Sequence, residues 1–217
     1  MNVHQPNRKL PRNRRKGIWQ FAEAATTFFR GFLEHPGMVA SVVPSSRSTI
    51  NAMLLPIDWA RCRLFVEFGP GVGTFTNHIL DCLPEDSTLL AIDTNPRFVE
   101  YLRNTIHDPR LQVVLGSAAD VESFVRAAGH SRADYVISGL PFSSLPLETA
   151  EQIVDATYAV MAEGGAFMTY QFRRTARRLT EGRFERVDTG LALSNVPPCV
   201  LVWGWKLKDC AVREAAE

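Results

Sequence analysis

The chain has 217 residues, 46% of them hydrophobic, and a formal net charge of +1. This size and apolar content predict one folded domain with a sizeable core, and the balanced charge excludes a uniformly basic or acidic chain. The four cysteines form no CxxC pair and cluster with no histidine, so we expect no metal site and no disulfide framework, in keeping with a reducing cytosol. No apolar run has the length that a membrane-spanning helix needs.

The N-terminal region combines a basic arm with a helical pattern. Residues 1–16 carry arginines and lysines without an acid, which predicts a disordered arm attracted to the phosphates of lipid or nucleic acid. Apolar residues then recur at the helical period over 18–33, and Pro36 and Gly37 end that amphipathic helix. A second helix is predicted over about 46–55, ending at Pro56.

From residue 63 the pattern alternates between strand and helix. Strands are predicted at 63–68, 87–93, 111–116, 133–139 and 166–172, with helices at 73–83, 96–106, 120–129 and 146–161. Two further strands, 183–194 and 199–206, follow each other without a helix between them. This order predicts an α/β fold: a mostly parallel sheet with helices on both faces and one antiparallel strand at its edge.

The stretch VEFGPGVGTFT, residues 66–76, joins the first of these strands to a helix. Gly69, Gly71 and Gly73 allow a ligand to approach bare backbone, and Asp93, twenty residues past Gly73, is placed to bind a ribose diol. The G-P-G-x-G spacing favours a ligand without a phosphate, because Pro70 lacks an N–H that could hold one. The alternative is a glycine-rich turn that binds nothing.

Together, VEFGPGVGTFT and AIDTNP (residues 91–96) resemble motif I and the following acidic motif of class I S-adenosylmethionine-dependent methyltransferases. The resemblance implies a Rossmann-like sheet and S-adenosylmethionine as cofactor. By resemblance, the cofactor-binding residues are Glu67, Gly69, Gly71, Gly73, Asp93, Thr94, Ser117, Ala118 and Ser138. Ser117 stands where the family has an acid that receives the adenine amine, so the Ser117 hydroxyl, the Ala118 N–H and Asp120 are the alternatives for that contact.

The stretch SGLPFSSLP, residues 138–146, is similar to the NLPY loop of the rRNA adenine dimethylases, where the substrate nucleophile lies. Gly139 replaces the Asn that clamps a planar amine, and it offers only backbone, which suits an aliphatic amine. The resemblance therefore implies that Gly139, Leu140 and Pro141 form the transfer site. The alternative is a Pro-rich turn that packs on the sheet edge.

Segments 28–47, 136–146 and 194–205 together resemble bacterial phospholipid N-methyltransferases. The family methylates phosphatidylethanolamine towards phosphatidylcholine, and related members act on ornithine lipid. The resemblance implies a cytoplasmic protein, peripheral at the inner membrane, whose N-terminal amphipathic helix contacts an anionic membrane surface. It also implies three parts: the basic arm 1–16, N-terminal helices 17–56 that cap the substrate at the membrane, and a methyltransferase domain 57–210.

Amine methylation requires a proton acceptor, and Tyr170, Glu148 and His35 are the candidates. A head-group phosphate would need cations, for which Arg47, Arg173 and Arg174 are placed. Two rival hypotheses stay open: an rRNA adenine N6-methyltransferase-like enzyme, although a nucleic-acid partner is not expected, and a membrane-binding protein with a vestigial cofactor site.

Overall fold

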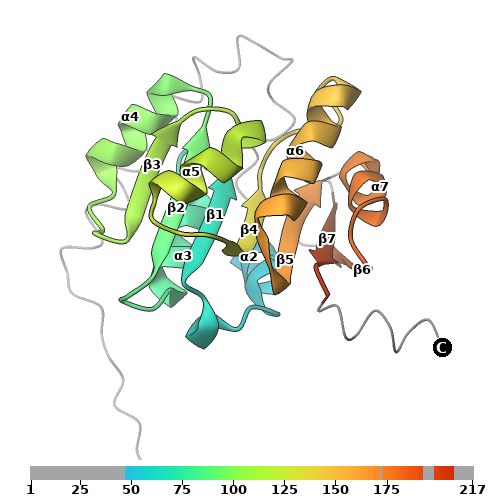
Figure 1. Ribbon diagram of the computed structural model, residues 1–217, viewed down its shortest axis with the longest axis horizontal. Helices are drawn as coiled ribbons and strands as arrows, with labels where there is room; N and C mark the ends of the chain where they lie inside the picture. Colours follow the sequence, from blue (N-terminus) through green and yellow to red (C-terminus); the bar gives the residue numbers. More distant parts are fainter. Residues whose placement is uncertain (1–46, 172, 193–197, 208–217) are drawn as a thin grey trace, which may run out of the picture. The chain divides into compact units, whose positions relative to one another are not determined.

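The computed structural model describes residues 47–171, 173–192 and 198–207, which all lie in the compact unit Ser41–Glu217 (Figure 1). The predicted basic arm, the amphipathic helix over 18–33 and His35 lie outside these residues, as does part of the segment 194–205. The hypotheses that rest on them therefore stay predictions, and so does the division of the chain at residues 16 and 56.

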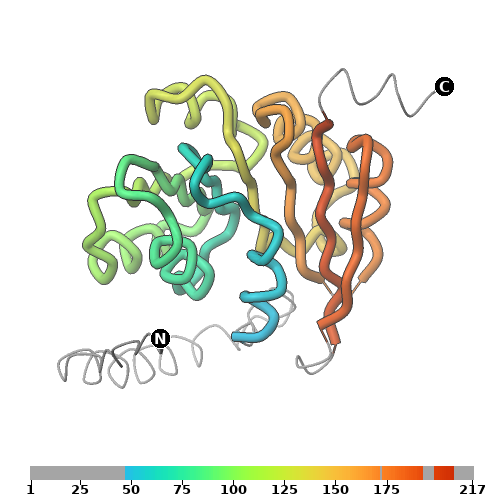
Figure 2. Tube along the Cα trace, turned by 90° about the horizontal axis from the view of Figure 1, so that it is seen from below, coloured from blue at the N-terminus to red at the C-terminus, as the bar shows by residue number. Residues whose placement is uncertain are grey.

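The described residues form one seven-stranded sheet of order β3-β2-β1-β4-β5-β7-β6. Its strands are β1 (Leu64–Phe68), β2 (Thr88–Asp93), β3 (Leu111–Leu115), β4 (Ala133–Ser138), β5 (Met161–Gln171), β6 (Arg186–Ala192) and β7 (Cys199–Trp205). Strands β1 to β5 pair in parallel, whereas β7 is antiparallel to both β5 and β6. The predicted mostly parallel sheet with an antiparallel edge is confirmed, and Figure 2 shows β6 and β7 side by side at that edge.

Helices cover both faces of the sheet. They are α2 (Arg47–Leu54), η2 (Trp59–Arg61), α3 (Thr74–Cys82), α4 (Pro96–Thr105), η3 (Ala118–Asp120), α5 (Val121–Ala127), α6 (Leu147–Val160) and α7 (Thr175–Glu181). Side chains of α2 and α3 pack in one apolar cluster, and those of α5, α6 and α7 pack in a second cluster across the sheet. In Figure 1, α5 and α6 accordingly lie in front of the strands, with α2 and α3 behind.

The order of the strands sets where a ligand site can form. Chain order runs outward from β1 through β2 to β3 on one side and from β4 to β5 on the other, so the topology reverses between β1 and β4. In open parallel sheets the crevice at the carboxyl ends of such a strand pair is the ligand site. The loops that follow Phe68 and Ser138 meet at this point.

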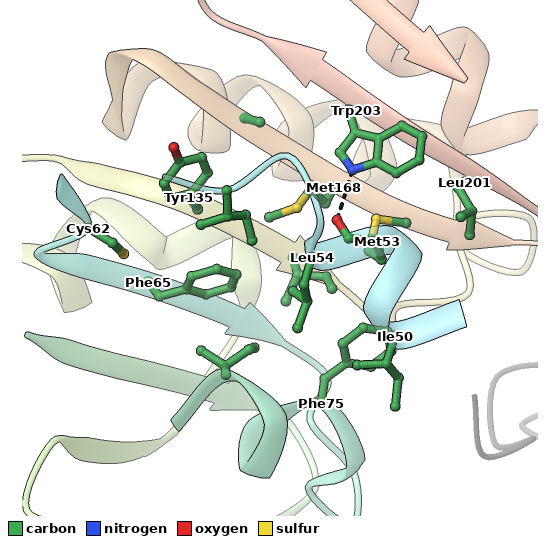
Figure 3. Close-up of a cluster of buried hydrophobic side chains, with 14 of the residues drawn as sticks. Ile50, Met53, Leu54, Cys62, Phe65, Phe75, Tyr135, Met168, Leu201 and Trp203 are labelled. Atoms are coloured by element: carbon green, nitrogen blue, oxygen red, sulfur yellow. Dashed lines mark hydrogen bonds between the residues drawn. The ribbon is translucent and has the colours of Figure 1, made fainter. Parts of the chain in front are cut away.

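Helix α2 is anchored to the sheet by buried side chains. Ile50 and Met53 are almost fully buried, and the indole Nε1–H of Trp203 on β7 donates to the Met53 carbonyl oxygen at 2.9 Å (Figure 3). The hydrogen bond satisfies a carbonyl near the end of the short helix, which has few intrahelical partners. Helix α2 therefore belongs to the hydrophobic core on one face of the sheet.

Helix α7 and the start of β5 differ from the sequence prediction. The run Thr175–Glu181 forms α7, for which no helix is predicted, because only Ala176 and Thr180 of its seven residues are buried and the apolar pattern is too short to read. Strand β5 begins at Met161, five residues before its predicted start, with a register shift against β4 near Ala133.

Over the described ranges, no helix is long and apolar enough to cross a membrane.

We predict that Trp203→Phe, which removes the indole N–H and part of the buried ring, lowers the free energy of unfolding by about 1–3 kcal/mol. Trp205→Phe is the matched control, since its indole donates at 2.7 Å to Asp188 at an exposed position and should change stability little. Urea denaturation of both variants checks this. Equal losses of unfolding free energy in the two variants would show that the hydrogen bond from Trp203 to the Met53 carbonyl adds no stability beyond packing.

Candidate active site

The three loop glycines all have left-handed backbone, with φ of 63° at Gly69, 55° at Gly71 and 80° at Gly73. A Cβ at Gly73 would lie 2.8 Å from the Leu102 side chain, and one at Gly69 would lie 3.0 Å from that of Leu140. A Cβ at Gly71 would meet no atom within 4 Å. The loop is therefore tightly packed at both ends, and at Gly71 its backbone borders open space.

Glu67 is a buried carboxyl group at the end of β1. It is 3% exposed, and its Oε2 accepts a hydrogen bond of 2.6 Å from the hydroxyl of Thr76 in the first turn of α3. Burial raises the pKa of Glu67 from its ordinary 4.5 to about 7, although the Thr76 bond lowers it; the charge of Asp93 raises it further. No basic side chain is among the neighbours that shift this pKa.

Asp93 ends β2 beside the glycine loop, as its spacing predicts. Its Oδ1 accepts from the Asn95 N–H at 2.8 Å, and its Oδ2 accepts from the Gly71 N–H at 3.4 Å. Burial raises the pKa of Asp93, and the backbone N–H donors of Asn95, Gly71 and Thr94 oppose that rise. Thr94 itself is exposed.

The SGLPF stretch lies against the glycine loop. The Gly139 N–H donates to the Phe68 carbonyl at 2.8 Å, and the Leu140 N–H donates to the hydroxyl of the buried Ser138 at 3.2 Å. The Gln171 side-chain amide donates to the Leu140 carbonyl. These bonds fix the first residues after β4, with Pro141 half-buried behind them.

Gly139 is where three segments converge. A Cβ there would lie 2.9 Å from the Gly69 carbonyl oxygen and 2.9 Å from the Tyr170 hydroxyl. The Tyr170 ring stacks on Phe75 with 4.7 Å between ring centroids. Burial, followed by the charge of Glu67, raises the pKa of Tyr170 above its ordinary value, so its phenol stays protonated near neutral pH. The sequence-predicted Tyr170 and Gly139 are thus neighbours, although Tyr170 is not a base in its own right.

Three other predicted residues, Glu148, Ser117 and Ala118, lie on or next to helices α6 and η3. Glu148 is exposed in the first turn of α6, a helix whose buried side chains pack in the cluster across the sheet from the one that holds Phe75 and Tyr170. The Ser117 hydroxyl caps η3 by accepting from the Ala119 N–H at 3.2 Å, and Ala118 is buried. This cap leaves the Ser117 hydroxyl hydrogen available to an adenine ring.

The predicted phosphate-binding arginines are all exposed. Arg47 is the first residue of α2, and Arg173 and Arg174 follow the end of β5. No ion pair joins Arg173 or Arg174 to another residue that the structure describes. Likewise, no group of three His, Cys, Asp or Glu side chains in the described part of the chain is arranged to hold a metal ion.

Sequence reasoning missed three residues of the site: Thr76, Phe75 and Gln171. A signal for the first two exists, because side chains in the first turn of a helix point back towards its N-terminus and so towards the end of the preceding strand. No local signal marks Gln171, whose contact with Leu140 depends on the pairing of β4 with β5.

Two observations test whether these residues fit S-adenosylmethionine. The open space at Gly71 lets a ligand lie against bare backbone. Glu67 and Asp93 are buried carboxyl groups that no basic neighbour compensates, which is a costly arrangement for a protein without a ligand. A cationic ligand with a ribose supplies positive charge for Glu67 and hydroxyl donors for Asp93, so the residues fit this cofactor.

Comparison with known proteins agrees with this geometry. Residues 65–165 match the model of a family described as a methyltransferase domain. The ornithine lipid N-methyltransferase of Singulisphaera acidiphila is 29% identical over 177 residues, which cover 79% of this chain and 90% of that protein. The ribosomal RNA small subunit methyltransferase H of Shewanella frigidimarina is 30% identical over 90 residues, which span only 29% of its length.

Among solved structures, the N-methyltransferase NodS from Bradyrhizobium japonicum, in complex with S-adenosyl-L-homocysteine, shares the fold. Its TM-score is 0.54 at 16% identity, covering 71% of this chain and 81% of that one. The sheet has the Rossmann-like fold of class I methyltransferases, residues 65–165 match a methyltransferase domain, and the cofactor is S-adenosylmethionine.

We predict that Asp93→Ala lowers cofactor affinity about ten- to a hundredfold, because it removes charge-assisted hydrogen bonds worth about 1.5–3 kcal/mol. Titration calorimetry with S-adenosylhomocysteine measures this, with circular dichroism to confirm that the fold survives. Affinity equal to that of the unmodified protein would rule out Asp93 as a cofactor ligand.

Glu67 makes the stability of the ligand-free protein depend on pH. Because its folded pKa is raised, the folded state holds the proton longer than the unfolded chain does, and stability falls as pH rises from about 4.5 to about 7. We expect a loss on the order of 3 kcal/mol over this window. Glu67→Gln should lack that loss, so its free energy of unfolding should change less between pH 5 and pH 8.

Urea denaturation at the two pH values checks this, with Glu148→Gln, an exposed acid on α6, as the matched control. The control should lose as much unfolding free energy between pH 5 and pH 8 as the unmodified protein. If Glu67→Gln also loses that much, Glu67 is not a buried, uncompensated acid.

Proposed function

We propose that the chain transfers a methyl group from S-adenosylmethionine to the amine of a lipid head group at the membrane surface. Phosphatidylethanolamine, methylated towards phosphatidylcholine, and ornithine lipid are the substrates that we infer. The main support is the similarity to an ornithine lipid N-methyltransferase, which extends over 90% of that protein. The matches to rRNA methyltransferase H proteins are confined to less than a third of their length.

The surroundings of Gly139 support an aliphatic amine over a nucleobase amine. A planar amine needs a side-chain amide such as Asn to clamp it, but any side chain at Gly139 would bring its Cβ within 2.9 Å of the Gly69 carbonyl oxygen. The site thus has no room for that clamp. An aliphatic amine needs only single hydrogen-bond acceptors and exclusion of water.

When bound, S-adenosylmethionine supplies a methyl group on a positively charged sulfur, which a neutral amine nitrogen can attack. The residues at Gly139 orient that amine. The Tyr170 oxygen, next to Gly139, can accept an N–H and so direct the nitrogen lone pair away from itself. Since the phenol stays protonated near neutral pH, Tyr170 holds the amine by this hydrogen bond and does not take up its proton, which leaves to solvent before the transfer. The charge of Glu67 contributes to the raised pKa of Tyr170.

Exposed arginines near the end of β5 support binding of a head-group phosphate. Arg173 and Arg174 have no ionic partner among the described residues, so their guanidinium groups are available to an anion. Arg47, at the start of α2, is a further cation on the face that carries Glu67. We propose that the N-terminal residues 1–35 bring this site to an anionic bilayer by their basic arm and amphipathic helix.

Incubation of the full chain with methyl-labelled S-adenosylmethionine and vesicles tests the function directly. Vesicles containing phosphatidylethanolamine and an anionic lipid, or ornithine lipid, should yield labelled lipid on chromatography. Label in rRNA but in no lipid would favour the adenine methyltransferase alternative. Sedimentation with vesicles without cofactor binding in calorimetry would favour the protein with a vestigial site.

We predict that Gly139→Ala lowers both turnover and cofactor affinity, because its Cβ displaces the Gly69 carbonyl in the cofactor loop as well as the Tyr170 hydroxyl. Gly182→Ala is the matched control, since a Cβ there meets its nearest atoms at an ordinary 3.5 Å. Kinetics and calorimetry on both variants check this. Full activity of Gly139→Ala would exclude this loop as the transfer site.

A further inference from the structure

Thr76 differs from two other buried helical threonines that the structure describes, Thr157 and Thr180. Thr157 and Thr180 each donate their hydroxyl to the carbonyl four residues earlier in their own helix, at 2.6 Å and 2.8 Å. Thr76 is equally buried, but its hydroxyl leaves the helix and donates to Oε2 of Glu67 at 2.6 Å. The bond thus joins the first turn of α3 to the end of β1, across the glycine loop.

The groups around Glu67 make the hydrogen bond from Thr76 important for whether Glu67 is ionised. Asp93 on β2 is a second acid, and Tyr170 on β5 is a phenol that keeps its proton. No basic group of the described chain shifts the pKa of Glu67, and burial raises that pKa. Thr76 is therefore the side chain that stabilises the ionised form, since a donor to a carboxylate favours its charged state.

We propose that Thr76 is a positioning residue for cofactor binding, whose hydroxyl keeps the Glu67 carboxylate ionised and oriented towards the cationic part of S-adenosylmethionine. Glu67 recognises the ammonium and sulfonium groups of that ligand, which supply the positive charge that no residue near its buried carboxylate provides. The proposal rests on the cofactor alone, so it holds whichever amine is methylated.

The test is the pH dependence of cofactor affinity in Thr76→Val, which keeps the shape of the side chain and removes the donor. In the unmodified protein, affinity for S-adenosylhomocysteine should rise with pH as Glu67 ionises near pH 7. In Thr76→Val we expect that rise to move upward by about one pH unit, which makes binding about tenfold weaker at pH 6. The difference should shrink to about twofold or less at pH 8.5.

Controls separate this role from a packing role. Thr76→Ser should restore the original pH profile, and Thr157→Val, which removes a buried hydroxyl with only a local partner, should leave it unchanged. In a Glu67→Gln background, Thr76→Val should not change affinity further. Thr76→Ala serves as the second variant if the valine variant does not fold.

Two results would overturn the proposal. One is a Thr76→Val profile that superimposes on that of the unmodified protein. The other is a loss of affinity of the same size at every pH, or one that persists in the Glu67→Gln background, because either would mean that Thr76 acts through packing and not through the charge of Glu67.

Discussion

The active site depends on a buried carboxylate that has no basic partner. Glu67 is held at the end of a fully buried strand, and the Thr76 hydroxyl is its main stabilising contact. Burying a charge in this way costs stability unless something compensates it, so proteins keep such groups mainly where a ligand supplies the opposite charge. The left-handed glycines and Asp93 surround this acid with bare backbone and a second carboxyl group. The site is thus built for a cation that carries a ribose.

Gly139 lies beside the glycine loop at the point where the sheet topology reverses. A Cβ at Gly139, after β4, would lie 2.9 Å from the Gly69 carbonyl oxygen after β1 and 2.9 Å from the Tyr170 hydroxyl on β5. Glycine is therefore required at position 139 because neighbouring segments of the chain leave no room for a Cβ there. In the proposed function, this leaves backbone groups and one phenol beside the amine and no room for a side chain at position 139, which fits an alkyl amine better than a nucleobase.

Much of this could be predicted from the sequence because the signals are local. Hydrophobic periodicity gave the alternation of strands and helices, and the spacing of Asp93 from Gly73 placed that acid beside the loop, where its Oδ2 meets the Gly71 N–H. Contacts between distant segments could not be predicted. The approach of Tyr170 to Gly139 and the bond from Gln171 to Leu140 follow from the register of β4 and β5, which the sequence does not display. Helix α7 is too short for its period to stand out.

A crystal structure of the protein with S-adenosylhomocysteine would test the central claim most directly. The account predicts the ligand against the Gly71 backbone, its ribose hydroxyls on Asp93 and its amino group within hydrogen-bond reach of Glu67 or of a water held by it. It also predicts that the sulfur points to the space beside Gly139 and Tyr170. A ligand that binds elsewhere, or that leaves Glu67 buried and without a cationic contact, would contradict it.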